Sequence, residues 1–317
     1  MATAPRHFRQ RCGQGLTWLQ RRWRALVLCL VAILSIACLF KPMWPLSRHV
    51  YRYLFVLDIT QSMNAQDYHA QGFPSDRLGY AKAALLKALH ELPCGSEAGL
   101  GVFTTQTVHT LFEPLEICEH FPVIDDALSH IDWRMAWSAD SHIETGLYHA
   151  LRTLKKSSLT TRLVFLTDGQ ETPPEGVQAQ YDGKPGDISG LLVGVGGIQP
   201  VTVPRYNQDN QMIGYWENED IDIPPISTTV YSEKTETRTL PRKGPYLSWL
   251  DEPRLKKLAA ITGLRYLRLE DPGVFTENLL ADDLAESRPA RTDLRPYLAI
   301  VSLLLFILTL AMEQRSP

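Results

Sequence analysis

The sequence predicts an α/β protein: a Rossmann-like domain with a mostly parallel central sheet and helices on both faces, flanked by two transmembrane helices. Short runs rich in β-branched and aromatic residues alternate along the chain with segments whose apolar residues repeat at helical spacing. Strands that alternate with helices in this way form parallel sheets covered on both faces. An uncharged apolar segment near each end of the chain predicts the two membrane spans.

The first apolar segment follows a strongly basic start. Six arginines and no acidic residue lie within residues 1–24, and residues 25–40 (ALVLCLVAILSIACLF) carry no charge. Residues 297–312 (YLAIVSLLLFILTLAM) repeat the apolar pattern. A helix of that length rises about 24 Å, whereas the apolar core of a membrane is about 30 Å thick. Each span is therefore expected to include flanking residues.

The basic start also predicts an orientation, because positive charges remain on the cytoplasmic side of a membrane. We expect residues 41–296 in the periplasm and both ends of the chain in the cytoplasm, with the protein in the inner (cytoplasmic) membrane. Three arginines before the second span oppose this orientation, but the charge bias at the first span is larger. A cleaved signal peptide, or lipidation at Cys38 in the lipobox-like SIAC, is the alternative for the first segment.

Between the spans we expect one domain over residues 50–287. The predicted elements are a strand at 50–57, a helix at 77–92 with Ser75 as its N-cap, two strands around a tight turn within 99–112, a helix at 142–156, strands at 162–166 and 189–195, a helix at 252–262 capped by Asp251, and a strand at 264–269. The proline-rich stretch 197–248 interrupts this alternation. We predict an inserted hairpin and loop there, with disorder in part of it as the alternative.

Composition and cysteine positions narrow the class further. The chain is 44% apolar and 21% charged with a net charge of −3, which excludes a disordered chain and gives no sign of nucleic-acid binding. Cys94 and Cys118 fall in the predicted periplasmic domain. We predict a disulfide between them, because that compartment is oxidising, with two buried free thiols as the alternative.

Acidic and hydroxyl side chains follow the predicted strands. The segment Asp58-Ile59-Thr60-Gln61-Ser62 follows the first strand, Thr167-Asp168-Gly169 follows the strand at 162–166, and Ser141 precedes a helix. Open parallel sheets bind ligands beyond the carboxyl ends of their strands. Two carboxylates and three hydroxyls, without His or Cys, suit Mg²⁺, Mn²⁺ or Ca²⁺ rather than zinc. The alternative is that both segments are ordinary turns at strand ends.

These segments resemble the von Willebrand factor A (VWA) family, whose metal-ion-dependent adhesion site reads DxSxS, then a Thr, then TDG. The resemblance covers residues 50–196 well and 246–270 more loosely. It implies one divalent cation, Mg²⁺ before Ca²⁺ or Mn²⁺. The ligands that it implies are the hydroxyls of Thr60, Ser62 and Ser141, with Asp58 and Asp168 bound directly or through water. Thr145 is the alternative third hydroxyl if SHIETGL aligns differently.

A closer resemblance is to bacterial MoxR-associated VWA membrane proteins. DITQSMNAQDY, LPCGSEAGLGVFT and IDWRMAWSADSHIETGL are similar to segments of the VWA proteins encoded with methanol dehydrogenase. The resemblance implies an assembly factor, not an enzyme, that acts in the maturation of that dehydrogenase and in the insertion of its Ca²⁺. The implied partner supplies a carboxylate to the metal and is another protein of the VWA and MoxR cluster or the apo dehydrogenase.

Two further interpretations concern the partner and the competing functions. Trp133, Arg134 and Trp137 lie just before Ser141 and are candidates for a partner-binding rim, with core packing as the alternative. A structural membrane scaffold and a hydrolase with Asp58 as nucleophile compete with the binding module. The hydrolase is disfavoured because its class requires a second Asp where this chain has Thr60.

Overall fold

The computed structural model describes residues 7–137, 140–157, 160–171, 179–220 and 244–314. The chain divides into two compact units. The larger unit is Arg48–Arg288, and the smaller unit combines Met1–Ser47 with Pro289–Pro317.

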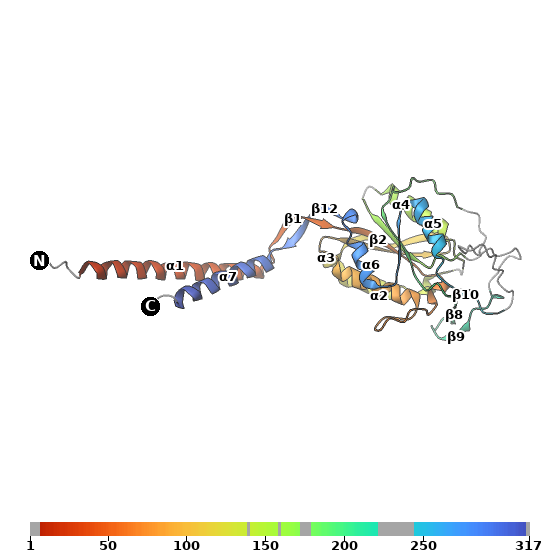
Figure 1. Cartoon of the computed structure of the whole chain (residues 1–317), viewed down its shortest axis with the longest axis horizontal. Helices are drawn as coiled ribbons and strands as arrows, with labels where there is room; N and C mark the ends of the chain where they lie inside the picture. The colour runs from red at the N-terminus through yellow and green to blue at the C-terminus, as the bar shows by residue number, and fades with distance from the viewer. Residues whose placement is uncertain (1–6, 138–139, 158–159, 172–178, 221–243, 315–317) are drawn as a thin grey trace. The chain divides into compact units, whose positions relative to one another are not determined.

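The larger unit is built on a six-stranded sheet with the strand order β11-β6-β5-β2-β3-β4 (Figure 1). The strands are β2 (Arg52–Asp58), β3 (Glu97–Thr104), β4 (Thr107–Glu116), β5 (Arg162–Thr167), β6 (Gly190–Gly194) and β11 (Arg265–Arg268). Neighbouring strands are parallel except for the edge strand β4, which pairs antiparallel with β3. The predicted α/β class with a mostly parallel sheet is confirmed.

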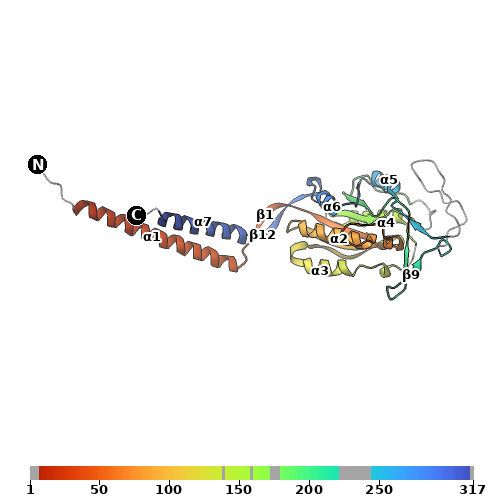
Figure 2. The ribbon, with the colours of Figure 1, turned by 60° about the horizontal axis from the view of Figure 1, so that its bottom comes forward.

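Helices cover both faces of this sheet (Figures 1 and 2). The helices are α2 (Arg77–Glu91), α3 (Ile117–His130) and α6 (Pro272–Leu279) on one face, and α4 (Ile143–Lys156) and α5 (Glu252–Thr262) on the other. Along β2, Phe55 packs into the core under the first set of helices, whereas Leu54 and Val56 pack into the core under the second. The middle of such a strand, Tyr53–Leu57 here, is a continuous apolar run because both of its faces are buried.

The N-terminus of α2 differs from the prediction. The N-cap is Asp76, whose carboxylate accepts a hydrogen bond from the backbone N–H of Gly79, and the helix begins at Arg77. The backbone carbonyl of Ser75 accepts instead from the N–H of Tyr68. The carboxylate one residue later thus takes the capping position that we predicted for Ser75.

Several elements were not predicted. They are α3, α6, the strands β1 (Met43–Val50) and β12 (Glu286–Asp293), and the 3₁₀ turns η1 (Gln61–Asn64), η2 (Trp133–Met135) and η3 (Asp282–Leu284). β1 and β12 form a two-stranded sheet of their own, and the boundary between the two units falls within both strands.

The segment predicted as an insertion contains short strands. At its base β7 (Val201–Thr202) pairs antiparallel with β10 (Leu247–Ser248). A hairpin follows, formed by β8 (Pro204–Tyr206) and β9 (Met212–Tyr215), and Asn210 in its turn has a φ of 59°. The hairpin is present where it was predicted; the loop at 221–243 lies outside the described residues.

The smaller unit contains the helices α1 (His7–Leu39) and α7 (Arg295–Gln314), which lie side by side in Figures 1 and 2. The hydroxyl oxygens of Ser35 and Ser302 are 3.2 Å apart between them. Among the described residues one helical segment, Arg22–Leu39, is long and apolar enough to cross a membrane, with a mean hydropathy of 2.0. The apolar part of α7, Arg295–Ala311, is shorter, so the second span stays a prediction.

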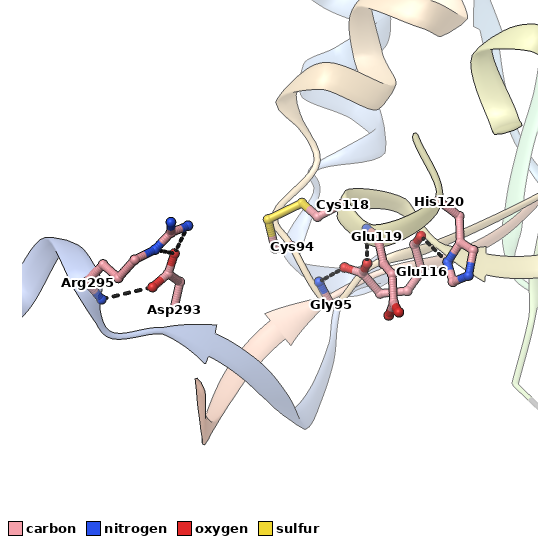
Figure 3. Close-up of a disulfide and its surroundings, with 8 residues drawn as sticks. All are labelled: Cys94, Gly95, Glu116, Cys118, Glu119, His120, Asp293 and Arg295. Atoms are coloured by element: carbon pink, nitrogen blue, oxygen red, sulfur yellow. Dashed lines mark hydrogen bonds and ion pairs between the residues drawn. A yellow bond between two sulfur atoms is a disulfide. The ribbon is translucent and has the colours of Figure 1, made fainter. Parts of the chain in front are cut away.

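A disulfide joins Cys94, just before β3, to Cys118 in the first turn of α3 (Figure 3). Beside it the carboxylate of Glu116 accepts hydrogen bonds from the backbone N–H groups of Gly95 and Glu119, both at 2.6 Å. The bridge and this helix cap together fasten α3 to the edge of the sheet.

Candidate metal centre

The predicted site residues lie at the carboxyl edge of three adjacent strands. Asp58 ends β2, and Asp168 directly follows β5, the parallel neighbour of β2. Ser141 pairs with Thr105, just beyond the end of β3 on the other side of β2. The five predicted ligands (Asp58, Thr60, Ser62, Ser141 and Asp168) are all buried, none more than 8% exposed. Parallel strands bring these distant segments to one edge, as open α/β sheets do at their ligand sites.

The loop after β2 is folded around the carboxylate of Asp58. Its Oδ1 accepts hydrogen bonds from the backbone N–H of Thr60 at 2.9 Å and from the Thr60 hydroxyl at 2.7 Å. The Thr60 and Ser62 hydroxyl oxygens are 3.3 Å apart. From β5, Thr167 donates its hydroxyl to Asp58 Oδ2 at 2.6 Å. Three oxygen-bearing side chains of this loop therefore converge, and Thr167 orients the carboxylate among them.

The carboxylate of Asp168 is held by the guanidinium of Arg77, a residue that the sequence analysis did not assign to the site. Its Oδ2 accepts a hydrogen bond from Arg77 Nη1 at 2.9 Å, and its Oδ1 accepts one from the backbone N–H of Gln170 at 3.0 Å. The nearby Ser62 hydroxyl also acts to lower the pKa of this carboxylate. The available signal was the position of Arg77, a charged residue on the same stripe of α2 as the buried Ala81 and Leu85.

The hydroxyl of Ser141 is buried and has no hydrogen-bond partner among the described residues. The hydroxyl of the neighbouring Thr105 is also buried and also has no partner among them. Buried polar groups normally have partners, so an orphaned hydroxyl at a site of carboxylates points to a ligand. Thr145, the alternative, is only half-buried and lies within α4. The structure thus favours Ser141 as the third hydroxyl.

The electrostatics of the site fit a bound cation. Burial and the nearby charge of Asp168 raise the pKa of Asp58 to about 7, against the opposing effect of hydrogen bonds from Thr167 and Thr60. Burial likewise raises the pKa of Asp168, although Arg77 acts in the opposite direction. Two buried carboxylates that resist ionisation together would be relieved by a positive ion between them. Two carboxylates and neutral hydroxyls are the donor chemistry of a hard divalent cation.

The predicted rim does not pack in the core of the sheet. Trp133, in η2, donates its indole N–H to Asn210 Oδ1 of the inserted hairpin at 3.1 Å. Arg134 pairs with Asp132 and reaches the backbone carbonyl of Gln208. Trp137 is 64% exposed and contacts the ring of His109. The hairpin β8–β9 and its turn therefore contact two of the three predicted rim residues, Trp133 and Arg134.

One other group of potential metal ligands occurs within the described part of the chain: Glu116, Glu119 and His120 (Figure 3). Both carboxylate oxygens of Glu116 already accept backbone hydrogen bonds, and His120 Nδ1 lies 3.1 Å from the Glu116 carbonyl. We interpret this group as the cap of α3.

Comparison with known proteins supports the assignment of the α/β fold to the VWA class. Residues 53–170 match the family model described as the von Willebrand factor type A domain. The chain therefore carries a VWA domain, and the matched residues include Asp58, Ser141 and Asp168. No curated protein matches the chain at a significant level.

Two solved structures of bacterial proteins are similar to this chain. An aerotolerance-related membrane protein from Bacteroides fragilis is 16% identical, with a TM-score of 0.47, and the match covers 72% of this chain and 96% of that one. The conserved hypothetical protein BatB from Bacteroides thetaiotaomicron is also 16% identical, with a TM-score of 0.46 and coverage of 73% and 98%. Similarity at this level carries no inference about function.

Proposed function

We propose that this protein is a membrane-anchored interaction and assembly factor whose VWA domain binds one divalent cation. The proposed donors are Asp58, Thr60, Ser62, Ser141 and Asp168. The observation that carries the proposal is the orphaned, buried hydroxyl of Ser141 at the same sheet edge as two buried carboxylates. An all-oxygen donor set favours Mg²⁺, with Ca²⁺ and Mn²⁺ as further candidates.

The cation would recruit a carboxylate from a protein partner. Three of the five donors are neutral hydroxyls, and one of the two carboxylates shares its charge with Arg77. A divalent cation in such a site keeps its attraction for a further anionic ligand. The exposed Trp137 and the η2–hairpin contacts would form the surrounding rim of the interface.

Catalysis is not part of the proposal. Both oxygens of Asp58 accept hydrogen bonds, from Thr60 and Thr167, and a hydroxyl residue stands where an aspartyl-nucleophile hydrolase requires a second acid. The hydrogen bonds that Thr60 and Thr167 donate to Asp58 support a role in holding a ligand rather than in nucleophilic attack.

The proposed location is the inner membrane, with the VWA domain in the periplasm. The apolar segment of α1 and the arginines before it support the anchor and its orientation. The Cys94–Cys118 disulfide supports an oxidising compartment, because such bonds persist outside the cytoplasm. We include α7 as a second span on the strength of its apolar composition.

The partner that we propose belongs to methanol dehydrogenase maturation. This part rests on the sequence resemblance to VWA proteins encoded with that enzyme, and it names the apo dehydrogenase or another protein of the VWA and MoxR cluster. The role of the metal site would be to hold the apo enzyme, or a cluster protein bound to it, while Ca²⁺ is inserted.

The proposal is tested by measuring association of the full chain, purified in detergent, with apo methanol dehydrogenase. We expect binding in Mg²⁺ that is lost on addition of a chelator and in Ser141→Ala. The matched variant Thr145→Ala, on the neighbouring helical turn, should bind like the wild type. Binding that resists the chelator would contradict the role of the metal. A chain that takes up metal but does not bind the apo enzyme would contradict the maturation role.

A further inference from the structure

Arg77 is a fully buried cation at the centre of a polar network. Its guanidinium donates to Asp168 through Nη1 at 2.9 Å, and to Asp67 Oδ2 through Nε at 2.9 Å and Nη2 at 2.6 Å. Nη1 also donates to the hydroxyl of Ser248 in β10 at 2.6 Å. The side chain is 0% exposed, so its charge acts with little screening by water.

The surrounding backbone is shaped to hold this guanidinium in place. Asp67 Oδ2 also accepts the backbone N–H of Gly197 at 2.8 Å. A Cβ at Gly196 would lie 2.5 Å from Arg77 Nε, and Gly196 has a φ of +117°, a conformation that favours glycine. The close approach of Gly196 and the hydrogen bond from Gly197 to Asp67 thus pack this backbone junction tightly around the guanidinium.

The charges of the network add up to a value that one divalent cation neutralises. Counted as formal charges, the carboxylates of Asp58, Asp168 and Asp67 carry three negative charges, and Arg77 carries one positive charge. The remainder of two negative charges matches a single Mg²⁺ or Ca²⁺.

We propose that Arg77 is the built-in counter-charge of the metal site, which stabilises Asp168 in the metal-free protein and limits how tightly the cation is held. This inference rests on the proposed metal site. An opposite charge within about 4–6 Å changes the proton affinity of a carboxylate by about 10- to 1,000-fold, and it would weaken the attraction of that carboxylate for a divalent cation in the same direction. Arg77 therefore keeps the bound cation exchangeable.

The direction in which metal affinity changes on removal of Arg77 distinguishes a counter-charge from a residue that only positions Asp168. If Arg77 only oriented Asp168, its removal would weaken metal binding, because one ligand would lose its geometry. If Arg77 is a counter-charge, its removal leaves the network more negative and tightens metal binding. Removal of the charge on Asp67 should weaken metal binding, because the positive charge of Arg77 is then balanced by Asp168 alone.

The experiment measures Mg²⁺ affinity by calorimetry on the full chain in detergent. We expect about tenfold or greater tightening in Arg77→Met and about tenfold weakening in Asp67→Asn, which keeps the shape of the side chain and an acceptor oxygen. Arg77→Lys, which keeps the charge, should stay within about threefold of the wild type. Arg162→Met is the matched control. Arg162 is also a buried arginine paired with a carboxylate, that of Glu286, but it is the first residue of β5 and lies at the other end of the strand from Asp168.

Weaker binding in Arg77→Met, or unchanged binding in Asp67→Asn, would overturn the counter-charge role. If Arg77→Met does not fold, Asp67→Asn decides the question alone. A wild-type chain that binds no metal would instead overturn the proposed function itself, and the counter-charge role with it.

Discussion

Removal of the Ser141 hydroxyl should stabilise the metal-free protein and weaken its response to metal. A buried hydroxyl without a partner costs about 1–3 kcal/mol, and Ser141→Ala removes that cost. For a unit as large as Arg48–Arg288, 1 kcal/mol corresponds to about 2–4 °C in Tm. We therefore expect the metal-free Tm to rise by at least about 2 °C.

The same substitution removes one proposed ligand. Loss of a group that only supports a metal ligand typically costs about 10- to 100-fold in affinity, so the loss of a ligand should cost at least about tenfold. At a fixed Mg²⁺ concentration above Kd, each tenfold loss lowers the stabilisation by about 1.4 kcal/mol. The Tm shift on addition of Mg²⁺ should then shrink by about 3–6 °C for each tenfold loss of affinity.

The assay is thermal unfolding of the full chain in detergent, with chelator and with Mg²⁺. Thr145→Ala serves as the control and should not reduce the Mg²⁺ shift. A Ser141→Ala variant that is less stable without metal, and that responds to Mg²⁺ like the wild type, would refute the assignment of Ser141 as a ligand.

Three further predictions follow from the fold and its charges. Replacing Cys94 and Cys118 by serine should lower the stability by about 3 kcal/mol, because the bridge closes a 24-residue separation; equal stability of the variant and the wild type in denaturant would contradict this. Because the pKa of Asp58 is raised to about 7, its contribution to the stability of the metal-free protein is full below about pH 4 and is lost as the pH rises through 7. Chelator-treated protein should therefore unfold more easily at about pH 8 than at about pH 5.5. Asp58→Asn should flatten this pH profile. A phosphatase reporter fused after residue 200 should be active if residues 41–296 face the periplasm. An inactive phosphatase, together with fluorescence of a cytoplasmic reporter fused at the same position, would contradict the predicted topology.

Much of the sheet could be predicted from sequence because its strands are buried on both faces. The runs that became β2 and β5 are uncharged and mostly aliphatic or aromatic from Tyr53 to Leu57 and from Leu163 to Leu166, and the acids Asp58 and Asp168 mark the ends of these runs, which locates both the strands and the site. Helix α4 was equally plain, because its apolar residues repeat on one face. The cap predicted at Ser75 was wrong by one residue, because only the hydrogen bond that Gly79 donates identifies Asp76 as the N-cap.

Other features depended on information that local patterns do not contain. Pro122 lies within α3 and breaks the pattern expected of a helix, so that helix went unpredicted. β1 contains polar residues and a proline, and it pairs with a strand more than two hundred residues away. The contacts of Arg77 with Asp168 and Ser248 likewise join segments that only the completed sheet brings together.

The central claim is that Asp58 and its neighbours hold one divalent cation. Calorimetric titration of the full chain with Mg²⁺, and in parallel with Ca²⁺, tests it most directly when wild type is compared with Asp58→Asn. The asparagine keeps an oxygen that can accept the two hydrogen bonds from Thr60, so the loop should remain folded. We predict one ion per chain for the wild type and no binding for the variant. Equal binding by both proteins, or none by the wild type, would contradict the account.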